Sequence, residues 1–98
     1  MAEITVPDAQ KRYTQDQILD VREDFEVAEG MIPGALHIPT GQLGSRLGDL
    51  DKDRPIIVVC RSGNRSAAMA DALNQAGYTA DTMAGGMTAW QRAGLPTR

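Results

Sequence analysis

The chain of 98 residues contains a single cysteine, Cys60. One thiol excludes an intramolecular disulfide, a zinc site built from several cysteines and a Cys-x-x-Cys redox pair. Any chemistry at this sulfur must therefore be completed by a thiol or another nucleophile from outside the chain. Aromatic residues are also scarce, at 4% of the chain against 42% hydrophobic residues in total. The core must be filled by aliphatic side chains and methionine, which suits a small sheet with helices packed closely on it.

Positive charge is not in excess either, because the net charge is -3 and the sequence pI is about 4.9. This balance opposes non-specific binding to nucleic acid or to an anionic membrane. The first residues lack a basic start followed by an apolar run, so no secretory signal is expected. No apolar run approaches the length of about 20 residues that a membrane-spanning helix needs. We expect one domain over residues 1–98, working in a reducing cytoplasm.

A run of four β-branched residues, Ile56–Val59, lies directly before Cys60. The run is too short for a buried helix and follows Pro55, so it predicts a strand buried on both faces. Beyond a polar loop, apolar residues recur at the spacing of one buried helix face: Met69, Ala72, Leu73 and Ala76. We expect that helix to start close to Ser66. Cys60 is thus predicted at the carboxyl end of a strand, just before a helix N-terminus.

The loop between this strand and this helix carries two arginines and a glycine. Ligands of open α/β sheets bind beyond the carboxyl ends of the strands, where unpaired N–H groups and the helix dipole favour anions. The same donors, with Arg61 and Arg65, favour the thiolate form of Cys60, and Gly63 lets the loop curl. The alternative is that Cys60 is an ordinary buried thiol. The two arginines argue against it, because burying unpaired guanidinium groups is costly.

Strands and helices alternate along the rest of the chain, which predicts a parallel sheet. The expected strands cover residues 3–6, 17–22, 35–38, 56–59 and 78–83, and the expected helices start near residues 7, 24, 40, 66 and 88. Thr40 is predicted to cap a helix with one apolar face formed by Leu43, Leu47 and Leu50. Asp20 and Arg22 share a strand face, and two opposite charges near a strand end suggest a charge pair or a loop anchor.

Two residues with chemical potential are expected to be structural. His37, the only histidine, lies in a short strand and has no partner in the sequence that would make it a base. Trp90 is expected to pack in the core from a short amphipathic helix. Gly85 and Gly86 follow the last strand on the edge where Cys60 emerges, and the sequence leaves open whether they form a wall of the site.

Three segments, in this order along the chain, resemble the signatures of the rhodanese family of sulfurtransferases, specifically its small single-domain members. They are Leu19–Glu23 with Glu26, Gly30–Ala35 and Ile38-Pro39; then Cys60–Ser66; and finally Gly85–Met87 with Ala89-Trp90 and Gly94–Pro96. Met31 stands where many members have histidine, and Val27 where an aromatic residue is common. Both departures lie in the first, structural signature.

The resemblance implies a three-layer α/β/α fold with a central five-stranded parallel sheet, and it implies Cys60 as the sulfur-accepting nucleophile. The thiolate would attack the outer sulfur of an anionic donor such as thiosulfate, release sulfite and become a persulfide. Backbone N–H groups would stabilise the persulfide, and the arginines would hold the donor. The substrate-binding residues are then Arg61, Ser62, Gly63, Asn64, Arg65 and Ser66. A thiol, a protein acceptor or cyanide would take the sulfur, with no cofactor or metal.

Two other classes of protein were weighed against this prediction. Cysteine-dependent phosphatases and arsenate reductases separate their cysteine and arginine by five residues, whereas four residues separate Cys60 from Arg65. The loop is therefore one residue short for a phosphate. A non-enzymatic module that binds partners or carries sulfur to a dedicated protein is the other alternative. The retained cysteine and both arginines argue against an inactive module, while sulfur delivery to a protein acceptor stays open.

Overall fold

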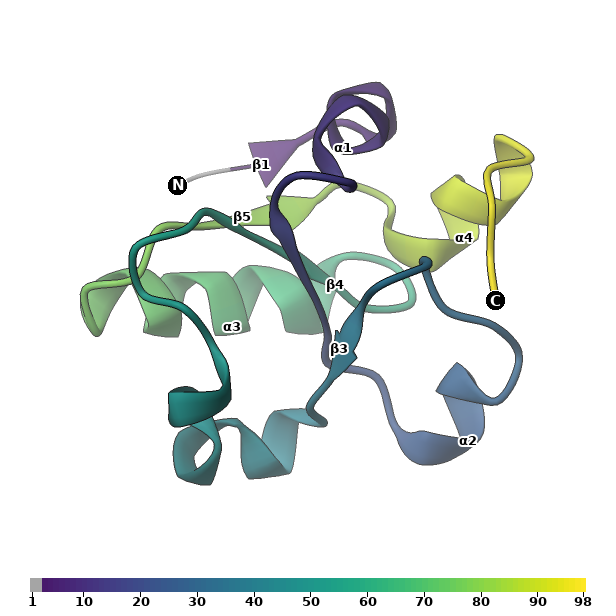
Figure 1. Ribbon diagram of the computed structural model, residues 1–98. Coiled ribbons are helices and arrows are strands. Elements are labelled where there is room, and N and C mark those ends of the chain that lie inside the picture. The colour runs from purple at the N-terminus through teal and green to yellow at the C-terminus, as the bar shows by residue number, and fades with distance from the viewer. Residues whose placement is uncertain (1–2) are drawn as a thin grey trace.

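Four consecutive β-branched residues place β4 (Ile56–Val59) at the centre of the sheet, where all four side chains are buried. The computed structural model describes residues 3–98. The other strands are β1 (Glu3–Ile4), β2 (Gln17–Asp20), β3 (Leu36–His37) and β5 (Ala80–Met83). All pairings are parallel, in the spatial order β1-β5-β4-β2-β3. The predicted five-stranded parallel sheet is confirmed (Figure 1).

Helices cover both faces of this sheet, so the predicted three-layer α/β/α fold is also confirmed. They are α1 (Val6–Arg12), α2 (Asp24–Val27), α3 (Asn64–Gln75) and α4 (Gly86–Arg92). The longest helix, α3, lies on one side of the strands, and α1 and α4 lie on the opposite side (Figure 1). No helix among residues 3–98 is long and apolar enough to cross a membrane. The prediction on a secretory signal includes residues 1–2, which lie outside the described residues.

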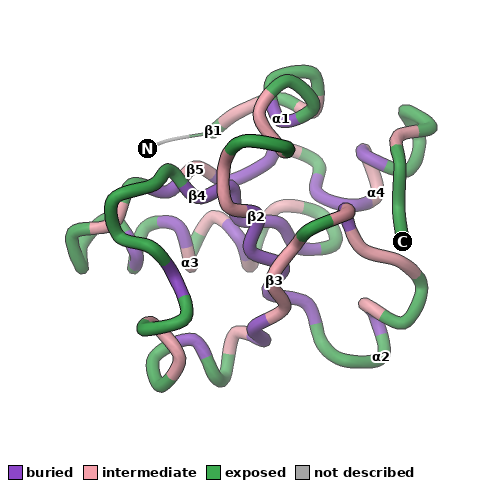
Figure 2. The backbone as a smooth tube through the Cα atoms, in the orientation of Figure 1, coloured by how far each residue is buried: buried purple, intermediate pink, exposed green. Residues whose placement is uncertain are grey.

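Alternation along β4 divides the interior into two cores. Ile56 and Val58 join the core beneath α3, whereas Ile57 and Val59 join the core beneath α1 and α4. In Figure 2 the buried backbone runs through the strands and the exposed backbone lies around the outside. Trp90 is completely buried in the second core and donates through Nε1 to the carbonyl of Pro96 at 2.8 Å. The predicted core position of Trp90 is therefore confirmed.

The segment after β3 differs from its prediction. It forms two short 3₁₀ helices, η1 (Thr40–Ser45) and η2 (Leu47–Asp49), instead of one α-helix. Thr40 is the first residue of η1, and no side chain caps that helix. Three glycines in ten residues raise the cost of an α-helix here, by about 1 kcal/mol each relative to alanine. The leucines still pack inward, since Leu43 and Leu50 are buried.

The buried face of α3 is rotated from the predicted one. The helix starts at Asn64, and its buried residues are Ser66, Ala70 and Leu73. Ala72 and Ala76 are exposed and, with Met69, Leu43 and Leu47, line a shallow apolar groove of about 260 Å³. The prediction from apolar spacing missed this rotation because it gave no weight to Ser66. That polar residue faces inward because it has buried partners at the sheet edge.

Several predicted strands are shorter in the structure. The first strand ends at Ile4 because Thr5 caps α1, accepting from the Asp8 N–H at 3.2 Å. The second ends at Asp20, the third keeps only Leu36–His37, and the last begins at Ala80. The last helix begins at Gly86, two residues before the predicted start.

Candidate active site

The Cys60 loop leaves the sheet where the direction of strand connection changes. The chain passes from β2 outward to β3, but from β4 it passes the other way to β5. The segments after β2 and β4 therefore diverge from adjacent carboxyl ends, which is where ligands of open α/β sheets bind. The register places Asp20 of β2 beside Val59 of β4, one residue before Cys60. Residues from both connections build the site.

The sulfur of Cys60 lies inside the turn that leads into α3. The Gly63 N–H donates to Sγ at 3.0 Å and the Ser66 N–H donates at 3.4 Å. The Ser66 hydroxyl oxygen lies 3.4 Å from the same sulfur. Gly63 has φ of +107°, a left-handed conformation that strains any residue with a Cβ, and this conformation closes the turn. The thiol thus lies in a cradle of hydrogen-bond donors at a helix N-terminus.

Two opposing effects set the acidity of this thiol. Cys60 has no exposed surface, and burial raises the pKa of the thiol because it disfavours the charged form. Hydrogen bonds from the Ser66 hydroxyl, and from the backbone N–H groups of residues 66, 63 and 62, lower it. The net pKa lies below the usual value for cysteine. The cradle therefore outweighs burial, whereas a cysteine buried among apolar groups alone would be inert.

A hydroxyl that the sequence analysis missed completes the cradle from β5. Thr82 is 1% exposed, and its Oγ1 lies 2.7 Å from the Oγ of Ser66. Ser66 Oγ also lies 3.1 Å from the carbonyl oxygen of Gly63, to which it can donate. Thr82 lies 22 positions beyond Cys60, so no local motif points to it. The one available signal was its place on the same strand face as Ala80, two residues earlier, which faces the α3 core.

The Arg65 side chain pairs with a carboxylate of α2. Its two terminal nitrogens donate to the two carboxylate oxygens of Glu26 at 2.7 and 2.9 Å. Glu26 is 5% exposed, and the hydrogen bond from Arg65 is the main cause that lowers its pKa from 4.5 to about 2. Burial opposes this shift, and the charge of Arg22 supports it. This bidentate pair ties the Cys60 loop to the connection that follows β2.

A second ion pair fixes α2 itself. The buried side chains of Asp20 and Arg22 meet at 2.8 Å, as the sequence predicted, and Arg22 also donates to the carbonyls of Glu26 and Gly30. The Asp20 carboxylate and the carbonyls of Glu26 and Gly30 thus supply hydrogen-bond acceptors for the buried Arg22 guanidinium. His37 belongs to the same framework, since its Nε2 lies 2.7 Å from the carbonyl oxygen of Arg22.

The start of α4 packs directly behind the Cys60 loop. The N–H groups of Met87 and Thr88 donate to the carbonyls of Cys60 and Arg61 at 2.8 and 3.0 Å. Gly86 has φ of +58°, and a Cβ at this position would lie 2.5 Å from the carbonyl oxygen of Cys60. Gly86 is thus required for close contact between α4 and the Cys60 loop, whereas a Cβ on Gly85 would meet Ala89 of its own helix.

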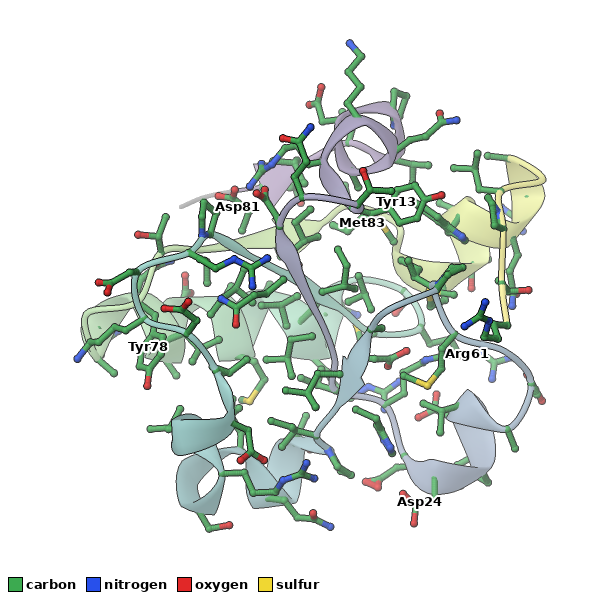
Figure 3. The ribbon with its side chains drawn as sticks, viewed as in Figure 1. Tyr13, Asp24, Arg61, Tyr78, Asp81 and Met83 are labelled. Atoms are coloured by element: carbon green, nitrogen blue, oxygen red, sulfur yellow. The ribbon has the colours of Figure 1, made fainter. Side chains whose placement is uncertain are left out.

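The structure gathers the predicted site residues at one edge but exposes them unequally. Cys60 and Ser66 are buried, Gly63 and Arg65 are half-buried, and Arg61, Ser62 and Asn64 are exposed. Figure 3 shows Arg61 between α4 and α2. Within residues 3–98, no group of three or more His, Cys, Asp or Glu side chains is placed to hold a metal ion. A hollow of about 500 Å³ beside Gln17 and Arg54 lies at the opposite, amino end of the strands.

Comparisons with known proteins find similar proteins over most of the chain. The model of a family described as rhodanese-like domain matches residues 5–93. The protein YtwF of Bacillus subtilis is 46% identical over 74 residues, which cover 76% of this chain and 72% of that protein. A sulfurtransferase of Allochromatium vinosum is 42% identical over 85 residues, covering 85% and 79%. The crystal structure of a rhodanese-related protein from Thermoplasma volcanium has a TM-score of 0.95 at 33% identity, covering 100% of this chain and 98% of that one.

Proposed function

The chain belongs to the rhodanese-like family, and from this premise we propose that it is a sulfurtransferase that carries sulfur as a persulfide on Cys60. The donor is a small anion with a sulfane sulfur, such as thiosulfate, and the acceptor is an external thiol, a protein or, in an assay, cyanide. The observation that supports this most directly is the set of donors around the Cys60 sulfur. Such a cradle stabilises negative charge on sulfur, which the reaction needs at each step.

The reaction has two displacement steps on sulfur. The Cys60 thiolate attacks the outer sulfur of thiosulfate, a new S–S bond forms, and sulfite leaves with the electron pair of the broken S–S bond. An acceptor thiolate or cyanide then attacks the outer sulfur of the persulfide, and Cys60 leaves as a thiolate. No electrons are gained or lost overall. Because the described chain has no second cysteine, the acceptor has to come from outside.

The loop residues are proposed to divide the work. Arg61 is exposed and is placed to attract the anionic donor. Backbone N–H groups of residues 61–66 stabilise the charge of the thiolate and then of the persulfide. Arg65 binds Glu26 with both terminal nitrogens, so it contributes to donor binding through its charge while holding the loop in place.

The site is less suited to a phosphate monoester. Phosphatases of this chemical type wrap a tetrahedral anion with a loop that is one residue longer between cysteine and arginine, as noted above. Here that arginine is engaged by Glu26, and the position one residue later is Ser66, whose hydroxyl faces the sulfur. We expect no turnover of an aryl phosphate.

Intact mass measurement tests the proposal. The protein is purified without reductant, incubated with thiosulfate and analysed under non-reducing conditions, with Cys60→Ser as the matched control. The expected result is a gain of one sulfur atom in the parent protein, reversed by cyanide, and no gain in the variant. The proposal is wrong if the mass stays unchanged with thiosulfate and also with other sulfane-sulfur donors, including polysulfide. An aryl phosphate assay is run in parallel, and hydrolysis of the ester would support the phosphatase alternative.

The cellular setting follows from the same chemistry. An external thiol acceptor and a single free cysteine suit a reducing cytoplasm. Neither nucleic acid nor a membrane surface is part of the proposed reaction, consistent with the net charge of -3. If a persulfide forms but is transferred neither to small thiols nor to cyanide, the chain is a carrier for a dedicated protein acceptor instead.

A further inference from the structure

Three buried groups form a chain across two elements on one face of the sheet. Cys60 follows β4, Ser66 lies in the first turn of α3, and Thr82 lies in β5. Their exposed fractions are 0%, 0% and 1%. The Ser66 oxygen is 2.7 Å from the Thr82 oxygen and 3.4 Å from the Cys60 sulfur. Within the hydrogen bonds of residues 3–98, Ser66 therefore links Thr82 to the sulfur.

Ser66 has one hydroxyl proton but three acceptors within reach. They are the carbonyl oxygen of Gly63 at 3.1 Å, the hydroxyl of Thr82 and the sulfur of Cys60. When Cys60 carries its proton, the thiol can donate to Ser66 Oγ, and the Ser66 proton can go to either oxygen. When Cys60 is a thiolate, its sulfur can only accept hydrogen bonds. The Ser66 proton therefore has to point toward the sulfur to stabilise its negative charge. The Ser66 oxygen then needs a donor of its own.

We propose that Thr82 is a positioning residue for Cys60: its hydroxyl donates to Ser66 Oγ and thereby holds the single Ser66 proton on the thiolate. Only hydroxyl rotations are involved, and the proton lost by Cys60 leaves to solvent or to an external base. The 2.7 Å separation of the two oxygens is the usual distance for a well-formed hydrogen bond between hydroxyls. This role rests on the proposed function, in which the Cys60 thiolate is the reactive form.

The fixed charges around the sulfur do not depend on Thr82. Arg65 acts on the sulfur from the loop, with Glu26 of α2 paired to it, and Arg61 is exposed at the edge. The remaining donors to sulfur are backbone N–H groups. A change of Thr82 to valine replaces its hydroxyl with a methyl group and changes neither the charged groups nor the backbone donors around the sulfur.

The test is titration of the Cys60 thiolate by its ultraviolet absorbance, with Cys60→Ser as the blank. Losing one neutral hydrogen bond should raise the pKa of Cys60 by about half a unit in Thr82→Val, and slow alkylation by iodoacetamide about threefold below that pKa. Thr82→Ser, which restores the hydroxyl, should restore the titration. Thr79→Val makes the same change at an exposed threonine and should have no effect.

A double-mutant cycle with Ser66→Ala separates a relay from a packing effect. If Thr82 acts through Ser66, Thr82→Val should add nothing to the pKa of Cys60 once Ser66 is alanine. The proposal is overturned if folded Thr82→Val titrates like the parent, if Thr82→Ser does not rescue, or if the two changes add. Thr82→Ala replaces the valine variant should that one fail to fold. The titration needs no sulfur donor, so it measures the effect of Thr82 on the pKa of Cys60 even if no persulfide forms.

Discussion

Glu26→Gln gives the sharpest test of how the active loop is held. The substitution keeps the shape of the side chain and one oxygen, but it removes the charge that Arg65 pairs with at 2.7 Å. It also keeps an acceptor for the Glu23 N–H, which now donates to Glu26 at 2.9 Å. Any loss of stability therefore reports mainly on the charge of the pair.

The magnitude follows from the pKa of Glu26, which falls from 4.5 to about 2 on folding. A difference of about 2.5 units at about 1.36 kcal/mol per unit corresponds to about 3 kcal/mol. The Arg65 side chain is 38% exposed, so solvent screens part of the attraction, and we expect about 1–2 kcal/mol in practice. Because the folded pKa is the lower one, this contribution is complete above about pH 5. It is lost as the pH falls through 4.5 toward 2.

Urea denaturation followed by the fluorescence of the single, buried Trp90 measures the effect. At pH 7 the parent should be more stable than Glu26→Gln by about 1–2 kcal/mol, and by pH 3 that gap should shrink by more than half. Glu29→Gln removes an exposed carboxylate from the same segment and should change stability by less than about 0.5 kcal/mol. A gap that stays constant between pH 7 and pH 3 would refute the ion-pair reasoning.

Two further predictions concern the framework behind the site. Gly86→Ala should destabilise the fold by about 3 kcal/mol in the same urea assay, because it combines a positive φ with a Cβ 2.5 Å from a carbonyl oxygen. Gly44→Ala, where a Cβ meets nothing within 4 Å, is its matched control and should be nearly neutral. Asp20→Asn should cost about 3–5 kcal/mol by stranding the buried charge of Arg22, whereas Asp49→Asn in an exposed pair should cost less than about 1 kcal/mol.

Local patterns were enough to predict most of the architecture. The β-branched run Ile56–Val59 predicts a strand buried on both faces, and the structure places this strand at the centre of the sheet. The charge pair of Asp20 and Arg22 was visible because the two residues are separated by the period of a strand. These predictions depend on neighbours within a few positions, which the sequence shows directly.

Two of the omissions share a physical cause, since each depends on partners far along the chain, whereas the error in residues 40–50 has a local cause. Arg65 and Glu26 are 39 positions apart, and no spacing rule connects them. The rotation of α3 follows from burying Ser66 against Thr82, which the apolar pattern treated as surface. In residues 40–50 the leucine spacing fitted an α-helix, but repeated glycines shifted the balance to 3₁₀ turns.

The ion pair between Arg65 and Glu26 has a consequence for anyone who wishes to transplant this chemistry. A graft of the loop from Cys60 to Ser66 onto another strand-to-helix junction would carry the thiol and its backbone donors. It would leave behind Glu26, and also Arg22, which holds the segment bearing Glu26 through two carbonyls. The minimal portable unit is therefore two adjacent parallel strands with both of their carboxyl-end connections. A designer should copy that pair rather than the seven-residue signature.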